Sequence, residues 1–105
     1  MTTSVIGLFE SRDVASKVLG ELTKAGFDKK AVEILQGVAV SKISSRLVEA
    51  GYEKDRAKSY GEAVEKGGAL VVAENTDDKA DAALSTMRRF EVLTPEALLE
   101  KIGGS

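Results

Sequence analysis

Two side chains in the middle of the chain carry the chemistry most typical of a ligand site. Tyr60 follows Arg56 by four residues, which places both on one face of a helix. A phenol in that position can donate a hydrogen bond to a bound ligand, with Arg56 one turn away. The same pattern is also typical of a tyrosine whose ring packs in the core while its hydroxyl stays at the rim. The pair is therefore a candidate ligand site, and packing is the simpler interpretation.

A second candidate site lies where polar residues gather around a predicted helix start. Asn75 and Thr76 supply neutral oxygen atoms there. The neighbouring carboxylates belong to Glu74, Asp77, Asp78 and Asp81. Calcium takes about six to eight oxygen ligands at ordered spacing, which this run does not provide. Carboxylates at a helix start also interact favourably with the helix dipole. We expect no metal ion here and keep Asn75 and Thr76 as ligand-binding candidates.

Two residue types that many enzymes use for catalysis, cysteine and histidine, are missing from the chain. Cysteine, histidine and tryptophan are absent, which excludes thiolate chemistry, Cys/His zinc sites and imidazole-based triads. Gly67 and Gly68 follow a predicted helix and open a strand, whereas phosphate-binding glycines follow a strand and open a helix. Tyr60 with Glu62 as its base is the weakest alternative, because residues two apart on a helix do not face each other. We expect no enzymatic activity and no cofactor.

Charge and length restrict the remaining classes. The 105 residues carry 15 basic and 17 acidic side chains, a net charge of -2. No strong positive field attracts nucleic acid or anionic lipid, and no apolar run is long enough to span a membrane. We expect one domain over residues 1–105, located in the cytoplasm, without nucleic-acid or membrane partners.

The first third of the chain predicts a strand, a helix and a second strand. Residues 5–9 form an apolar run typical of a strand buried on both faces. Ser11 is a good N-cap for a helix over residues 14–25, which Gly26 ends in a left-handed conformation. Alternation around residues 32–34 then predicts the second strand.

The remainder predicts helices interrupted by two further strands. Ser41 is expected to cap a helix that ends at Gly51, and a charged helix follows over residues 53–66. Residues 69–73 are the most apolar segment and predict a central strand. The last elements are a helix begun by residues 75–78, a strand at 90–93 and a helix at 95–102 behind the Thr94–Pro95 cap.

This order predicts an α+β fold, a ferredoxin-like βαβ-α-βαβ sandwich. Its four-stranded sheet would have helices on one face and a short C-terminal helix in addition. Strands 5–9 and 69–73 would be neighbours in the middle. Because both are apolar on both faces, something must cover the second face of the sheet. We expect a second subunit to do so, giving a homodimer; the helix at 95–102 is the rival explanation.

One stretch is similar to a known family. Residues 60–73, with their tyrosine, charged helix, Gly-Gly pair and apolar strand, resemble bacterial heat-induced stress proteins of the YflT-like, general-stress-protein type. The opening strand, the first helix and Gly26-Phe27-Asp28 are similar too, so the resemblance covers about residues 4–90. It implies a small stress-associated bacterial domain with no established reaction. The helix after Phe90 departs from that pattern.

These observations favour a non-enzymatic, stress-associated domain that acts through protein–protein contacts or self-association. The partner would be a second copy or another protein, because exposed strand edges and sheet faces invite pairing. The alternative is a small-molecule-sensing regulatory domain. Its site would lie near the Tyr60 helix, with Arg56, or at the Asn75–Thr76 helix start.

Overall fold

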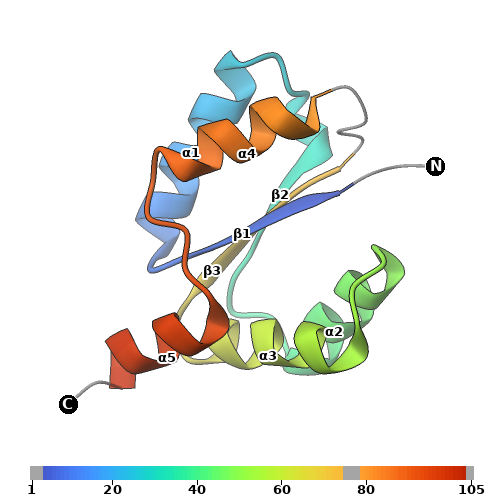
Figure 1. Cartoon of the computed structure of the whole chain (residues 1–105), viewed down its shortest axis with the longest axis vertical. Coiled ribbons are helices and arrows are strands. Elements are labelled where there is room, and N and C mark those ends of the chain that lie inside the picture. The colour runs from blue at the N-terminus through green and yellow to red at the C-terminus, as the bar shows by residue number, and fades with distance from the viewer. Residues whose placement is uncertain (1–3, 75–78, 104–105) are drawn as a thin grey trace.

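The computed structural model describes residues 4–74 and 79–103. Within them the chain alternates short strands with helices (Figure 1). In chain order the elements are β1 (Val5–Phe9), α1 (Arg12–Lys24), the 3-10 turn η1 (Lys29–Ala31), β2 (Val32–Leu35), α2 (Val40–Glu49), α3 (Lys54–Glu65), β3 (Ala69–Ala73), α4 (Ala80–Arg88) and α5 (Pro95–Gly103).

The strands form one antiparallel sheet in the order β1-β3-β2. Ile6 lies opposite Val72 and Leu8 opposite Leu70, so the predicted pairing of these two strands is confirmed. Only β3 lies in the middle of the sheet, because β1 is an edge strand. All five residues of β3 are buried, because the strand has a partner on each side and helices above and below. The central strand therefore anchors both edge strands.

Helices cover both faces of the sheet. In Figure 1, α1 and α4 lie above the sheet, and α2, α3 and α5 lie below it. The upper core joins Phe9 and Val71 of the sheet to Leu22 of α1 and Met87 of α4. The lower core includes Leu8, Leu35, Ile43, Leu47, Ala57, Val64, Leu70 and Leu98. The protein is thus a three-layer arrangement of helices, sheet and helices.

The predicted four-stranded sheet with helices on one face is wrong. Among the described residues the sheet has three strands, and residues 90–93 contribute an isolated antiparallel bridge between Leu8 and Leu93. The amide of Leu93 donates to the carbonyl of Leu8 over 2.8 Å. Pro95 follows two residues later and opens α5, so the chain turns away after one contact.

The C-terminal helix covers part of the second sheet face within the same chain. Leu98 of α5 is fully buried in the lower core, and α5 packs against α3. Leu98 lies so close to Gly68 that any side chain at that glycine would collide with it. We expected a second subunit to cover this face of the sheet. The face is instead covered by α2, α3 and α5 of the same chain.

Several local predictions are confirmed and one is not. The hydroxyl of Ser11 accepts from the amide of Val14 at the start of α1, and Thr94 caps α5 through the amide of Ala97. Gly67 has a φ of 117°, as its role in ending α3 requires. The prediction that Ser41 caps a helix is wrong. Helix α2 begins at Val40, and Ala39 occupies the cap position without a side-chain hydrogen bond.

In the part of the chain that the structure describes, no helix has the length and apolar character to cross a membrane.

Candidate functional site

The outer edge of β1 is the feature of the fold most suited to binding. The carbonyl of Leu8 faces away from β3, because it accepts the amide of Leu93. Backbone groups alternate along a strand, so the N–H and C=O of Ile6 face the same outer side. No described residue forms a hydrogen bond with these groups of Ile6. The edge is therefore open at Ile6 and closed at Leu8.

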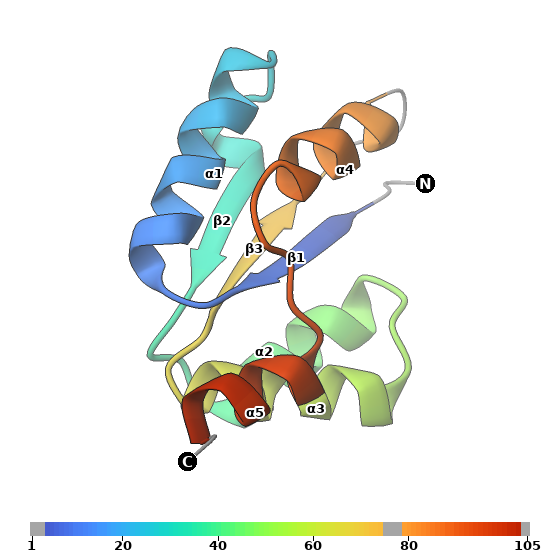
Figure 2. The ribbon, with the colours of Figure 1, turned by 60° about the vertical axis from the view of Figure 1, so that its left-hand side comes forward.

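Partly buried apolar side chains pack against the lower core, on the face of the sheet that carries the Ile6 side chain. Ile6, Tyr52, Tyr60 and Leu93 pack against the lower core and remain partly exposed. We call these four residues the edge patch. Figure 2 shows β1 at the border of the sheet, with the connection between α4 and α5 crossing it. The partly exposed side chain of Ile6 and its open backbone groups combine apolar contact with hydrogen-bonding capacity at this edge.

Ion pairs with Lys101 of α5 hold the segment that crosses β1, residues 91–93, in place. Lys101 lies 3.2 Å from the carboxylate of Glu10, just after β1, and also pairs with Glu91, just before the bridge. Hydrogen bonds to Glu91 and Glu10 raise the pKa of Lys101 above its usual value. This pairing holds residues 91–93 beside the end of β1, away from Ile6.

The predicted pair of Arg56 and Tyr60 does come together. The guanidinium of Arg56 lies 5.3 Å from the centre of the Tyr60 ring, in a cation–π contact. It also pairs with Glu96 of α5 at 3.6 Å. Because Arg56 is engaged twice and the ring packs against the lower core, the arrangement favours an interaction surface over a pocket for a small anion.

Tyr52, in the turn between α2 and α3, completes the aromatic side of the edge patch. Burial raises the pKa of its phenol above the ordinary value, and the nearby Tyr60 raises it further. Both effects favour the protonated phenol, which donates a hydrogen bond. At neutral pH the edge patch therefore presents neutral aromatic side chains.

The opposite edge of the sheet, along β2, is protected by charge. Glu33 stands in the middle of β2, and Arg46 of α2 bridges it to Glu74 at the end of β3. The amide of Val32 already donates to the carbonyl of Lys29. Charged side chains on an edge strand discourage pairing with another chain. The outward amide of Ile34 therefore lies in a much less favourable setting than that of Ile6.

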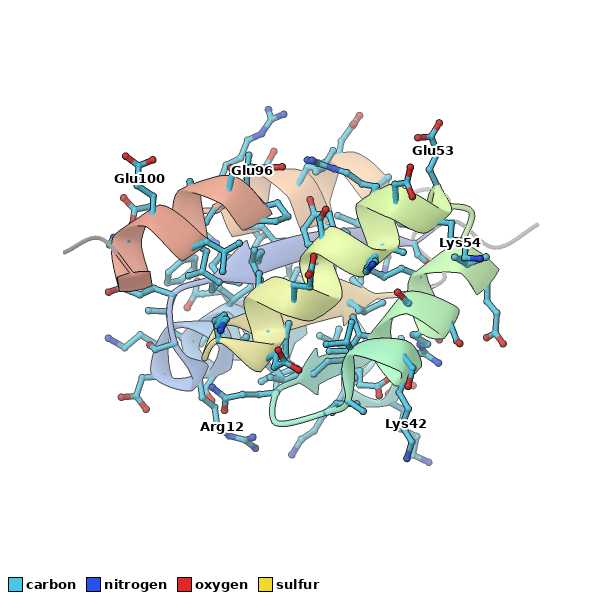
Figure 3. All side chains as sticks on the ribbon, turned by 90° about the horizontal axis from the view of Figure 1, so that it is seen from below. Arg12, Lys42, Glu53, Lys54, Glu96 and Glu100 are labelled. Atoms are coloured by element: carbon cyan, nitrogen blue, oxygen red, sulfur yellow. The ribbon has the colours of Figure 1, made fainter. Side chains whose placement is uncertain are left out.

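A groove lies between α2 and α3. It measures about 520 Å³ and is lined by Ser44, Ser45, Val48, Glu49, Lys54 and Lys58. Figure 3 shows this helical layer from below, with Lys42 and Lys54 extending outward. Lys54 and Lys58 lie on the opposite side of α3 from Tyr60, so the groove and the edge patch are separate surfaces. The groove is open and contains no buried polar group.

The other sequence candidates do not contribute to a described site. Asn75 and Thr76 lie outside the described residues, as do Asp77 and Asp78. Across residues 4–74 and 79–103, no three acidic side chains gather closely enough to hold a metal ion.

Sequence reasoning missed the parts of the site that are made by the backbone. Nothing in a single sequence shows that Ile6 faces an open edge, because this depends on which strand takes the central place. One signal was available: residues 5–9 contain no charge, whereas residues 32–35 contain Glu33. Tyr52 lies between the two predicted helices, and nothing in its position along the chain indicates that it lies near Tyr60.

Comparison of the chain with protein-family models, with curated proteins and with solved structures gives no match. The resemblance to heat-induced stress proteins remains a prediction from residues 60–73 and the opening elements.

Proposed function

We propose that the protein is a non-enzymatic interaction domain that binds an extended polypeptide segment along the outer edge of β1. The observation that carries the proposal is the contrast within one strand. Leu8 already accepts an antiparallel backbone contact from Leu93, while the same groups of Ile6 have no described partner. Strand addition at an exposed sheet edge is a common mode of peptide recognition.

The surroundings of Ile6 supply the contacts that strand addition needs. Each backbone hydrogen bond contributes about 0.5–1.5 kcal/mol net, so a short pairing needs side-chain contacts in addition. The edge patch adds two tyrosines and two aliphatic residues that pack against the lower core and remain partly exposed. Tyrosine is enriched at protein interfaces because it combines a large apolar area with a polar end. An incoming segment with an apolar residue beside Ile6 fits this surface best.

A small-molecule-sensing role is the second candidate, supported by the groove between α2 and α3. Lys54 and Lys58 stand there on one side and Ser44 and Ser45 on the other, with exposed Val48 between the two helices. These residues suit a small anion with an apolar part. An increase in the thermal midpoint on addition of such compounds, lost in Lys58→Gln, would support this role. The cytoplasmic location and the stress-related setting remain predictions from the sequence, and neither proposal needs them.

A peptide titration tests strand addition directly. The probe is a synthetic peptide with the sequence of residues 4–9 and lysines added at both ends for solubility. We expect chemical-shift changes at the amides of Ser4 and Ile6 and at the edge patch, and none along β2. A matched variant, Ile6→Pro, removes the outward N–H while leaving the ladder to β3 intact, so it should weaken binding. Absence of any shift at Ile6 with excess peptide would contradict the proposal.

A further inference from the structure

We infer that the segment that binds the β1 edge is β1 of a second copy, so that two sheets join into one continuous antiparallel sheet. This inference rests on the proposed function and names its partner. Because α2, α3 and α5 cover the lower face of the sheet, that face cannot drive dimerisation. The open edge of β1 is the surface that can.

The length of open edge restricts what can bind. Leu93 occupies the outward carbonyl of Leu8, so pairing on this side is limited to the beginning of the strand. Among the described residues the open outward positions are Ile6 and, by continued alternation, Ser4. A partner must therefore use a short segment that ends before the crossing at Leu93.

The direction of pairing is also indicated by the structure. Leu93 meets Leu8 in antiparallel orientation, which shows that this side of β1 has the geometry for an antiparallel neighbour. A strand that pairs antiparallel with its own copy obeys two-fold symmetry without further adjustment. β1 is a suitable partner for itself, because its five residues are uncharged and apolar on both sides of the sheet.

One register satisfies all of these conditions. Placing Ser4 opposite Ile6 of the second copy gives two symmetric pairs and about four backbone hydrogen bonds. Val5 then faces Val5 of the second copy at the centre. A register centred on Ile6 would instead place Ser4 opposite Leu8, whose carbonyl is taken by Leu93. The register through Val5 uses the open groups and leaves the crossing segment in place.

The register makes a sharp prediction for cysteine cross-linking. Residues facing each other between hydrogen-bonded pairs have Cα atoms about 4.5 Å apart, within the range that a disulfide spans. The natural chain contains no cysteine, so Val5→Cys introduces a single thiol. Under mild oxidation we expect Val5→Cys to form a disulfide-linked dimer. Ile34→Cys, at the β2 edge, is the matched control and should form no disulfide-linked dimer under the same conditions.

Light scattering coupled to size exclusion measures the association itself. We expect a mass of twice 11.1 kDa at high protein concentration. Ile6→Pro removes one outward N–H from each copy and should raise the dimer dissociation constant about tenfold or more. Ile34→Pro removes an outward N–H from the β2 edge instead and should leave the dimer dissociation constant unaltered. Ser4→Pro is a second disrupting variant that changes no residue of the described strand, in case Ile6→Pro does not fold.

The outcomes separate this inference from the proposed function. A dimer that Ile6→Pro or Ser4→Pro weakens and that Val5→Cys captures supports both. A monomer that binds the residue 4–9 peptide overturns the second copy as partner and leaves the proposed function standing. A dimer unaffected by both proline variants and not captured through Val5→Cys uses another surface and overturns the inference. A monomer that binds no peptide overturns both.

Discussion

The two edges of the sheet differ although both belong to strands that pair with β3. β1 carries no charge, offers open backbone groups at Ile6, and contributes the Ile6 side chain to the edge patch. β2 carries Glu33 in an ion-pair network with Arg46 and Glu74, and its first amide is already bonded. Edge strands are usually protected by charge or by a covering segment. The comparison teaches that charge protects the β2 edge, whereas the β1 edge is covered only at Leu8, where Leu93 crosses.

Both edges depend on the central strand, so a charge placed there should have the largest effect. Val72 is 1% exposed and lies between Ile6 of β1 and Glu33 of β2. Val72→Asp buries an unpaired carboxylate and should cost more than about 4 kcal/mol, enough to abolish folding. Circular dichroism during thermal unfolding checks this. A soluble Val72→Asp protein with a cooperative transition would contradict the central position of β3.

The crossing segment at the β1 edge depends on the anchoring of α5. Leu98 is fully buried in the lower core, so Leu98→Ala should lower the free energy of unfolding by about 2–5 kcal/mol. Loosening α5 should also release Leu93 and lengthen the open edge. Leu99→Ala, on the same helix but 37% exposed, is the matched control and should change stability little. Equal effects of the two variants in urea denaturation would contradict the packing of α5.

The turn that leads into β3 depends on a left-handed glycine. Gly67 has a φ of 117°, a conformation that other residues adopt only under strain. Gly67→Ala should therefore cost about 1 kcal/mol or more in urea denaturation. Gly20, an exposed helical glycine of α1 with free space around it, provides the opposite control: Gly20→Ala should stabilise the protein slightly. A stabilising Gly67→Ala would contradict this role.

Removing the charge from β2 should make its edge resemble that of β1. Glu33→Val eliminates both the mid-strand carboxylate and one partner of Arg46. Because the pair is partly exposed, stability should change by less than about 1 kcal/mol. The expected change is in association: light scattering should show larger species than the dimer, since each copy then has two open edges. Glu33→Gln retains a polar side chain and should not produce them.

The edge patch can be followed by alkaline titration. The raised pKa of Tyr52 means that the folded protein keeps this phenolic proton where the unfolded chain has begun to lose it. Its contribution to stability is therefore complete below the ordinary pKa of about 10 and is lost as the pH rises through the folded value. The chain has two tyrosines and no tryptophan, so ultraviolet absorbance resolves the ionisation. Tyr52→Phe should remove the component that titrates above the ordinary range; its persistence would contradict the assignment.

Local signals in the sequence identified much of the fold. The apolar runs at residues 5–9 and 69–73 are strands, the Ser11 cap begins α1, and Gly67 ends α3 as expected. These predictions succeed because each depends on residues within one or two turns of each other.

Predictions that depended on distant contacts failed. The apolar character of β1 and β3 on both faces correctly required two covering layers, but the choice between a second subunit and this chain's own helices depends on long-range packing. Residues 90–93 have strand-like composition, yet their position beside Leu8 permits a single bridge. The adjacency of Arg56 and Tyr60 follows from helical spacing, whereas the open backbone at Ile6 follows from strand order, which spacing does not encode.

The central claim is that the β1 edges of two copies pair with each other. Amide hydrogen exchange tests it most directly when Ile6 and Ile34 are followed together in two samples, one at low and one at high protein concentration. Both amides face the outside of an edge strand, so they are matched in everything except the edge to which they belong. The account predicts that protection of Ile6 increases with concentration while that of Ile34 stays constant. Equal behaviour of the two amides at all concentrations, or protection that increases at Ile34 alone, would contradict the account.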